Sequence, residues 1–310
     1  MTRAKTIIHK FSSLVFRKCN NTEHLPPGAR AITGIISVNY HRLPQFIYYR
    51  TNMPELPDIE VFTRNLNKIF AGKKLLKIKI ADGRKLKDAP NAYPEALDGK
   101  ILERIYRSGK EMRFAFSGGT LLGLHLMLTG DIFVFDKKND HHSAIAEFYF
   151  RDAPGLVLTD RMKNANIKLN PVDKTGVDAI SPQLNFKYLK AAFKRKTTVK
   201  KLLTDQDVIR GIGNSYSDEI LWQAKISPYS IAAAIPDDKI KMLVPIIKKT
   251  LKKETEQIYK KYKGKINVEV KEFLQIHTKV KTKSPTGFPI IIDQKGLMKT
   301  YYTKEQVLYK

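Results

Sequence analysis

The sequence predicts an α+β protein in which one amphipathic helix leads into a β-sandwich, and further helices and a C-terminal β-hairpin follow. Three observations predict this class. Apolar residues recur at helical spacing just after residue 54, short runs rich in β-forming residues then continue to residue 158, and helical periodicity returns from residue 186. Many short strands joined by tight turns are typical of a sandwich or barrel.

The first helix is expected over residues 57–70, and Gly72 follows it as a stop signal. Its apolar face is formed by Ile59, Phe62, Leu66, Ile69 and Phe70. Strands are expected over residues 75–80, 101–106, 112–116, 121–128, 131–135, 145–150 and 156–158. Gly118-Gly119, Thr129-Gly130 and Pro154-Gly155 separate several of these runs as turns.

The second half of the chain is expected to be helical. Helices are predicted over residues 186–193, 198–203, 215–224 and 237–262, and a hairpin over 283–309, where Pro-Thr-Gly and Lys-Gly turns flank short β-like runs. The predicted divisions are an extension (1–52), a β-sandwich domain (53–170), a linker (171–185), a helical domain (186–272) and a hairpin (273–310).

The charge balance points to a polyanionic partner. Lys and Arg outnumber Asp and Glu by 56 to 30, which gives a net charge of +26. Such a charge favours DNA or RNA over an anionic membrane surface, although a basic protein without such a partner has the same composition. No apolar stretch approaches the roughly 18 residues of a membrane span. A single cysteine, Cys19, excludes an intramolecular disulfide framework and a thiolate zinc finger, and fits a reducing compartment.

Residues 1–52 differ from the rest of the chain. They carry eight basic residues against the single acid Glu23, a net charge of +7, and they lack sustained periodicity. Three interpretations remain open: a transit peptide, a basic arm that adds DNA affinity, or upstream sequence translated by mistake with Met53 as the true start. The third is preferred for a chemical reason given below, so we expect a bacterial cytoplasmic, nucleoid-associated protein rather than an organellar one.

Two motifs carry a resemblance. The first is MPELPDIE at residues 53–60, and the second is IRGIGNSYSDEIL at residues 209–221, which follows Asp205-Gln206 and precedes ISP at 226–228. Together they resemble the formamidopyrimidine-DNA glycosylase/endonuclease VIII family, from Met53 to the C-terminus. The resemblance implies a β-sandwich with an N-terminal helix, a helix–two-turn–helix domain and a β-hairpin finger. It also implies a bifunctional DNA glycosylase/AP lyase that removes oxidised bases from damaged double-stranded DNA as a monomer, without a membrane partner.

The resemblance implies that the nitrogen of Pro54 is the nucleophile. It would attack the anomeric carbon of the damaged nucleotide, expel the base and form a cationic iminium that promotes strand cleavage by elimination. An internal proline nitrogen is a tertiary amide without nucleophilicity, so Pro54 must be the first residue of the working enzyme. A start at Met53 achieves this, because a small second residue permits removal of methionine.

Other site residues come from the same resemblance. Glu55 is the expected general acid, and Asp58 has a supporting role because it stands where family members usually carry glutamate. Lys110, between two predicted strands, is expected to grip a phosphate beside the lesion. Asn214 opens a helix after two glycines, where backbone amides and an asparagine side chain bind phosphate well; an ordinary helix cap is the alternative.

The residues expected to fill the gap left by a flipped base depart from the family pattern. Leu128 takes the place of the usual methionine, and the second loop, residues 159–164, lacks phenylalanine. Leu128 is the expected wedge, with Met162, Lys163 and Asn164 as open replacements in the second loop. These departures leave a non-catalytic or AP-lyase-only damaged-DNA-binding protein as the alternative function.

The finger departs from the family as well. The positions of four zinc cysteines fall on Lys283, Thr286, Thr303 and Gln306, so no zinc or other cofactor is expected and the hairpin resembles the zincless fingers of some relatives. The family's finger arginine falls at Met298. Its neighbour Lys299 is expected to make the phosphate contact instead, since that contact needs charge more than a planar fork.

Overall fold

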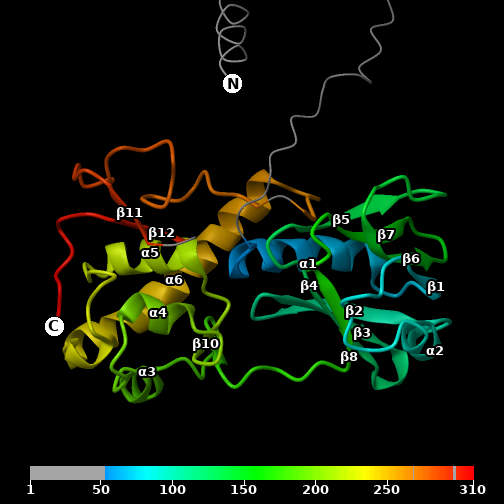
Figure 1. The fold of residues 1–310 in the computed structure, drawn as a ribbon, viewed down its shortest axis with the longest axis horizontal. Helices are drawn as coiled ribbons and strands as arrows, with labels where there is room; N and C mark the ends of the chain where they lie inside the picture. The colour runs from blue at the N-terminus through cyan, green and yellow to red at the C-terminus, as the bar shows by residue number, and fades with distance from the viewer. Residues whose placement is uncertain (1–52, 268, 296–297) are drawn as a thin grey trace, which may run out of the picture. The chain divides into compact units, whose positions relative to one another are not determined.

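The computed structural model describes residues 53–267, 269–295 and 298–310, which form an α+β fold with two antiparallel sheets and a separate group of helices (Figure 1). The expectations for residues 1–52 lie outside the described residues. Within the described part of the chain, each helix is too short or too polar to cross a bilayer. The predicted fold class is confirmed.

Helix α1 (Leu56–Phe70) follows directly from its sequence. Glu55 and Asp58 form a reciprocal capping box, and Pro57 stands in the first turn, where a missing N–H costs nothing. Its buried face packs Phe62, Leu66 and Phe70 into the core between the sheets. The helix ends at Phe70, and Gly72 has a φ of 80°, which suits glycine.

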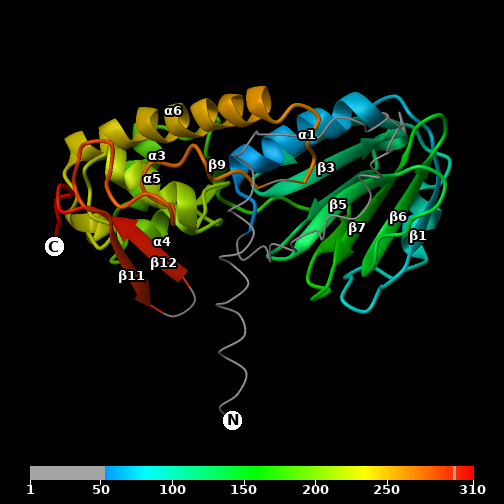
Figure 2. The same ribbon diagram turned by 90° about the horizontal axis from the view of Figure 1, so that it is seen from above.

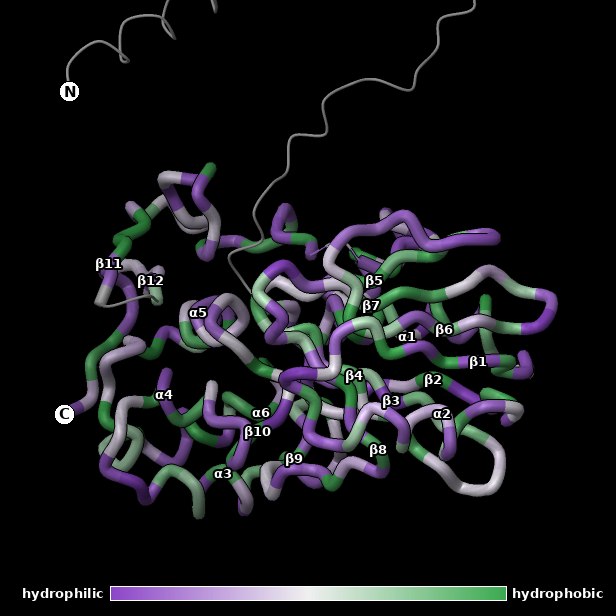
Figure 3. The backbone as a smooth tube through the Cα atoms, turned by 45° about the vertical axis from the view of Figure 1, so that its right-hand side comes forward, coloured by the Kyte–Doolittle hydropathy of each residue, from purple (hydrophilic) through white to green (hydrophobic). Residues whose placement is uncertain are grey.

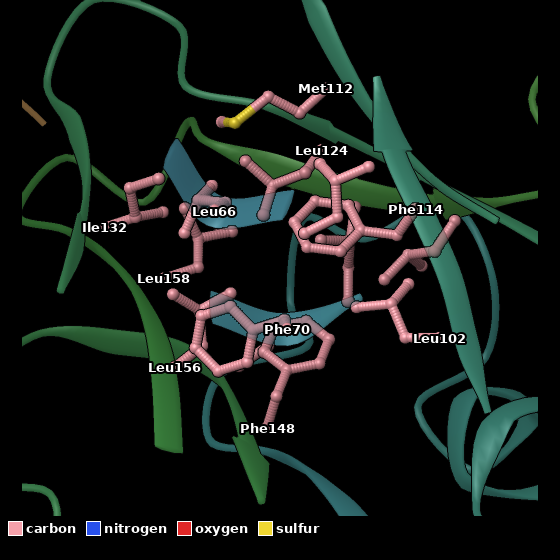
Figure 4. Packing of buried hydrophobic residues seen from close by; sticks show 14 of the residues in the cluster. Leu66, Phe70, Leu102, Met112, Phe114, Leu124, Ile132, Phe148, Leu156 and Leu158 are labelled. Carbon is pink, nitrogen blue, oxygen red and sulfur yellow. The ribbon is translucent and has the colours of Figure 1, made fainter. Parts of the chain in front are cut away.

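The two four-stranded sheets form the predicted sandwich. The first has the order β1 (Leu75–Ile80), β6 (Ala144–Phe150), β7 (Gly155–Asp160), β5 (Gly130–Phe135). The second has the order β2 (Leu102–Ser108), β3 (Glu111–Phe116), β4 (Leu121–His125), β8 (Asn166–Leu169). Leu102 and Phe114 of one sheet and Phe148 and Leu158 of the other face the same core as Phe70 of α1 (Figure 4).

Two sequence expectations for this part need correction. The run 121–128 was expected to be one strand, but β4 ends at His125 and Met127 has a φ of 54°. Leu126 is still buried, but the backbone has already left the strand at this point, so Leu128 lies in a loop. Helix α2 (Ala92–Leu97), strand β8 and the short 3-10 turns η1 (Ser117–Gly119) and η2 (Ala232–Ala234) were not predicted, because segments this short carry no measurable periodicity.

The helical part contains the predicted helices with shifted ends. They are α3 (Phe186–Ala192), α4 (Val199–Thr204), α5 (Asn214–Gln223) and α6 (Asp237–Lys261). Asn185 and Thr198 cap α3 and α4, each accepting a backbone N–H three residues later. Two-residue strands β9 (Val177–Asp178) and β10 (Ile209–Arg210) pair in parallel. In Figure 3 hydrophobic and hydrophilic stretches alternate within single helices and strands, as one-sided burial requires.

The C-terminal hairpin is confirmed as β11 (Ile291–Lys295) paired antiparallel with β12 (Met298–Tyr302). Strand β12 contacts α5, and α1 lies alongside α6 (Figure 2). Helix α1 therefore touches both the sheets and the helical part, and its first residues lie where the site is expected.

Candidate active site

The carboxylate of Glu55 is held at the N-terminus of α5. Its Oε2 accepts the backbone N–H of Gly213 at 2.5 Å and that of Tyr216 at 3.3 Å, and Oε1 accepts that of Ser215 at 2.7 Å. The side chain is 3% exposed. A helix N-terminus favours a negative charge because its first amides lack partners within the helix. Glu55 thus ties the start of α1 to a helix more than 150 residues later.

Lys110 lies beside this carboxylate, at the turn between β2 and β3. A Cβ placed on Gly213 would stand 2.5 Å from Lys110 Nζ and also 2.5 Å from Glu55 Cδ, so both side chains close over the same glycine. Burial lowers the pKa of Lys110, and the negative charge of Glu55 opposes that shift. The role of Lys110 was predicted only from its alignment with the family. Nothing in the sequence indicated that Lys110 lies close to Glu55.

Pro54 is buried and immediately precedes Glu55. In the chain as numbered its nitrogen belongs to the amide bond with Met53. Pro54 nevertheless lies directly before Glu55, whose carboxylate lies near Lys110, and just before the positive end of the α1 dipole.

Asp58 supports the site through its backbone contacts. One of its oxygens accepts the N–H of Glu55 at 3.2 Å, and the other accepts the N–H of Val270 at 3.1 Å. Burial, followed by the charge of Glu269, raises the pKa of Asp58 to about 8. Asp58 therefore joins the first turn of α1 to the segment after α6, a role the sequence did not indicate.

Asn214 is the first residue of α5, and Gly213 rather than Asn214 is the N-cap. The Asn214 amide donates to the backbone carbonyl of Lys299 in β12 at 2.9 Å. The expectation that the backbone amides here bind phosphate is wrong for Gly213, Ser215 and Tyr216, because the carboxylate of Glu55 occupies them. The structure does bring Asn214 and Lys299 together, and their DNA contacts stay predictions.

The two predicted wedge loops both carry exposed apolar side chains. Leu128, after β4, is 47% exposed and Met162, after β7, is 56% exposed. Lys163, in contrast, donates to the carbonyl of Ala144 at 3.0 Å and lies 3.6 Å from Asp82. Its ammonium is engaged within the protein, so the expected DNA contact of Lys163 gains no support and stays a prediction.

Asp160 joins these two loops and was missed by the sequence analysis. Its carboxylate accepts the hydroxyl of Thr129 at 2.5 Å and the backbone N–H groups of Met162, Asn164 and Ala165 at 2.7–2.8 Å. Burial favours the neutral acid, but these donors outweigh it and lower the pKa of Asp160. In the sequence, Asp160 was recognisable only as an acidic residue at the start of a loop that the family alignment places against DNA.

The described residues contain no cluster of three or more His, Cys, Asp or Glu side chains that could hold a metal ion. His125 is half-buried near Lys110, and its desolvation, with help from the charges of Lys110 and Lys174, lowers its pKa to about 4. Its Nδ1 accepts the N–H of Met127 at 2.9 Å, so the neutral imidazole supports the wedge loop.

Comparison with known proteins agrees with this geometry. Family models described as the formamidopyrimidine-DNA glycosylase N-terminal domain and the formamidopyrimidine-DNA glycosylase H2TH domain match residues 53–167 and 175–263. The formamidopyrimidine-DNA glycosylase of Lactobacillus johnsonii is 32% identical over 217 residues, covering 66% of this chain and 78% of that protein. The enzyme of the same name from Streptococcus pneumoniae is 32% identical over 187 residues, covering 57% and 68%.

Solved structures share the fold. A Lactococcus lactis Fpg in complex with DNA containing an abasic site superposes with a TM-score of 0.72, at 22% identity, over 80% of this chain and 97% of that one. MutM in complex with DNA containing carbocyclic 8-oxo-G superposes with a TM-score of 0.73, at 24% identity, over 81% and 98%. With both family domains in order and the motifs of Glu55 and Gly213 in contact, the chain belongs to the formamidopyrimidine-DNA glycosylase family of DNA-repair enzymes.

Proposed function

We propose that this DNA-repair glycosylase removes oxidised bases from duplex DNA and then cleaves the strand as an AP lyase, with the amine of Pro54 as nucleophile. The observation that carries the proposal is that the Glu55 carboxylate and the Lys110 ammonium both lie against Gly213, and Glu55 directly follows Pro54 in the chain. An acid, a cation and a prospective secondary amine are the groups that this chemistry needs.

The first step forms a bond between the Pro54 nitrogen and C1′ of the damaged nucleotide. The bond from C1′ to the base breaks and the base takes up a proton from water, while the proton lost by the Pro54 nitrogen passes through the Glu55 carboxylate to the sugar ring oxygen as the ring opens. The remaining adduct is an iminium, which acidifies the C2′ proton. Loss of that proton expels the 3′ phosphate, a second elimination expels the 5′ phosphate, and water releases the sugar fragment from Pro54.

This chemistry requires Pro54 to be the first residue. An α-amino group has a reference pKa near 8, and the positive end of the α1 dipole disfavours its ammonium form, so a useful fraction is neutral near pH 7. With Met53 attached, the same nitrogen is an amide and cannot attack. The active form is therefore the chain that begins at Pro54.

The proposed partner is damaged double-stranded DNA, bound by a monomer. Lys110, Asn214 and Lys299 hold phosphates of the damaged strand, because Lys110 faces the reacting residues and Asn214 touches the strand that carries Lys299. Leu128 and Met162 fill the gap left by the flipped base, since both are exposed apolar side chains on loops that Asp160 fixes to each other.

Borohydride trapping tests the proposal. Protein starting at Met53, with methionine removal verified by mass spectrometry, is compared with the 310-residue chain on duplexes carrying an abasic site or an oxidised base. We expect a covalent adduct only from the short form, on both duplexes, and digestion followed by mass spectrometry should locate the sugar on Pro54. Equal trapping by both forms, or an adduct on a lysine, would refute the role of Pro54.

The same assay separates the alternatives. An adduct with abasic duplex alone would identify an AP lyase without base excision, which the departures at Leu128 and in the second loop would then explain. Tight binding to damaged duplex without any adduct would identify a non-catalytic damage-binding protein. Excision assays on a panel of lesions then define the preferred base and its opposite base.

A further inference from the structure

The finger lacks the residues that bind zinc in family members. The four expected ligand positions are Lys283, Thr286, Thr303 and Gln306, and none of them offers a thiolate or imidazole. These residues do not fit Zn²⁺. The hairpin nevertheless has two turns that must be joined, around residues 284–288 and 303–306, and both must be fixed to the helical part.

The carboxylate of Glu305 stands between these turns and the end of α5. Its Oε1 accepts the indole N–H of Trp222 and the ammonium of Lys225, each at 2.5 Å. The hydroxyl of Thr286, one of the four ligand positions, donates to the same carboxylate at 2.8–2.9 Å. Glu305 is 10% exposed, so it joins three separate segments from a largely buried position.

The charge of Glu305 is stabilised by its donors. Burial alone favours the neutral acid, but the hydrogen bonds from Lys225, Thr286 and Trp222 outweigh it and lower the pKa of Glu305. Lys225 also lies over the ring of Trp222, 4.9 Å from its centroid, so the two donors pack against each other. An anion surrounded by convergent donors links the segments much as a cation surrounded by thiolates does, with the charges reversed.

A second ligand position makes a parallel link. The Gln306 side chain accepts the N–H of Thr303 at 2.8 Å and donates to the carbonyl of Ile226 at 2.8 Å. Below both links, Trp222 packs with Ile276, Ile290 and Tyr301 in a small apolar cluster. Tyr301 belongs to β12, the strand of Lys299, so this packing sets where Lys299 lies relative to α5.

We propose that Glu305 takes the place of a metal ion in this finger, linking the turn at Thr286 to Trp222 and Lys225, and that it is a positioning residue for the DNA contact of Lys299. The finger is then independent of zinc. The DNA part of this inference rests on the proposed function, whereas the link itself does not.

Trp222 makes the link directly observable, because it is the only tryptophan in the chain. The variants Glu305→Gln and Thr286→Val are made in the 310-residue protein, with Glu256→Gln as the control because Glu256 forms an exposed ion pair with Arg64 outside the finger. We expect a red-shifted Trp222 emission and stronger acrylamide quenching in E305Q, a smaller change of the same kind in T286V, and none in E256Q. Chelation by 1,10-phenanthroline should leave the wild-type emission unchanged, and zinc analysis should find no stoichiometric metal.

The affinity for a duplex with a tetrahydrofuran abasic analogue tests the positioning role. We expect E305Q to weaken binding roughly tenfold, the value of one lost hydrogen bond to a charged group. In protein starting at Met53, its single-turnover rate at saturating enzyme should stay at the wild-type value. Unchanged emission in E305Q, or loss of the wild-type signal on chelation, would overturn the link. Altered emission with control-level affinity would overturn only the positioning role. A wild-type protein that binds no duplex at all would count against the proposed function, and the fluorescence results would still decide the link.

Discussion

A methyl group added at Gly213 is the smallest change that tests the active-site geometry. Gly213 has a φ of −127° and a ψ of −157°, which other residues adopt, so backbone strain does not require glycine there. The new Cβ would stand 2.5 Å from both Glu55 Cδ and Lys110 Nζ. Ordinary contacts begin near 3.4 Å, so each group must retreat by about 1 Å.

The two groups differ in their freedom to move. Lys110 can swing its flexible side chain, but Glu55 cannot retreat without stretching its hydrogen bonds to three backbone amides. A displacement of about 1 Å in a catalytic group costs on the order of a hundredfold in rate. Overpacking in a tight interior costs about 1–3 kcal/mol of stability. Gly213→Ala should therefore slow excision about a hundredfold. It should also lower the free energy of unfolding by about 1–3 kcal/mol.

Single-turnover excision by protein starting at Met53, normalised to the folded fraction, measures the first effect, and thermal unfolding measures the second. Gly155→Ala is the matched control, because its Cβ would meet the ring of Phe135 at 2.2–2.7 Å, at the end of the β5–β7 ladder opposite to Asp160. It should lose stability and keep its rate. A G213A enzyme as fast as wild type would refute the geometry argued for Glu55 and Lys110.

Three further predictions concern ionised groups around the site. Asp160→Asn should raise the KM for lesion duplex and increase proteolytic cleavage of both wedge loops, because the new amide nitrogen would face backbone N–H donors. Wedge loops that stay intact in this variant would count against the prediction. Asp58 has a raised pKa of about 8, so its contribution to stability is full below its unfolded pKa of about 4 and is lost as pH rises through 8. Asp58→Asn should therefore flatten the pH dependence of the unfolding free energy between about pH 4 and 8, and an unchanged slope would refute the assignment. Burial lowers the pKa of Lys110, so DNA affinity should fall at a lower pH than an ordinary lysine would allow, and Lys110→Arg should move that fall upward in a binding titration.

The sequence predicted most elements of the fold because their periodicities are long enough to measure. Helix α1 has a complete apolar face, a capping box and a terminal glycine, and all three signals agree. Strand β8 spans four residues and α2 spans six, with Pro94 inside, so neither offers a pattern. The strand expected to reach Leu128 ended at His125, since an apolar run does not reveal where the backbone turns.

The candidate active site was harder to predict from the sequence, because it is assembled from three segments that lie far apart in the chain. Glu55, Lys110 and Gly213 come together only through tertiary packing. The resemblance nominated Glu55 and Lys110 but could not show that both lie against Gly213. The alignment likewise predicted a DNA contact for Lys163, whereas in the structure its ammonium binds the carbonyl of Ala144 and lies near Asp82. Asp160 and Glu305 had no motif, since a carboxylate that organises loops looks like any surface acid in the sequence.

Helix α5 binds the carboxylate of Glu55 at one end and the finger at the other. Its ten residues span about 15 Å as a nearly rigid rod. Glu55 occupies the amides at its start, and Trp222 and Lys225, at its end, hold Glu305. The first turn of α1 and the finger are therefore attached to opposite ends of one short helix, so the separation between Glu55 and Glu305 is set by the length of α5.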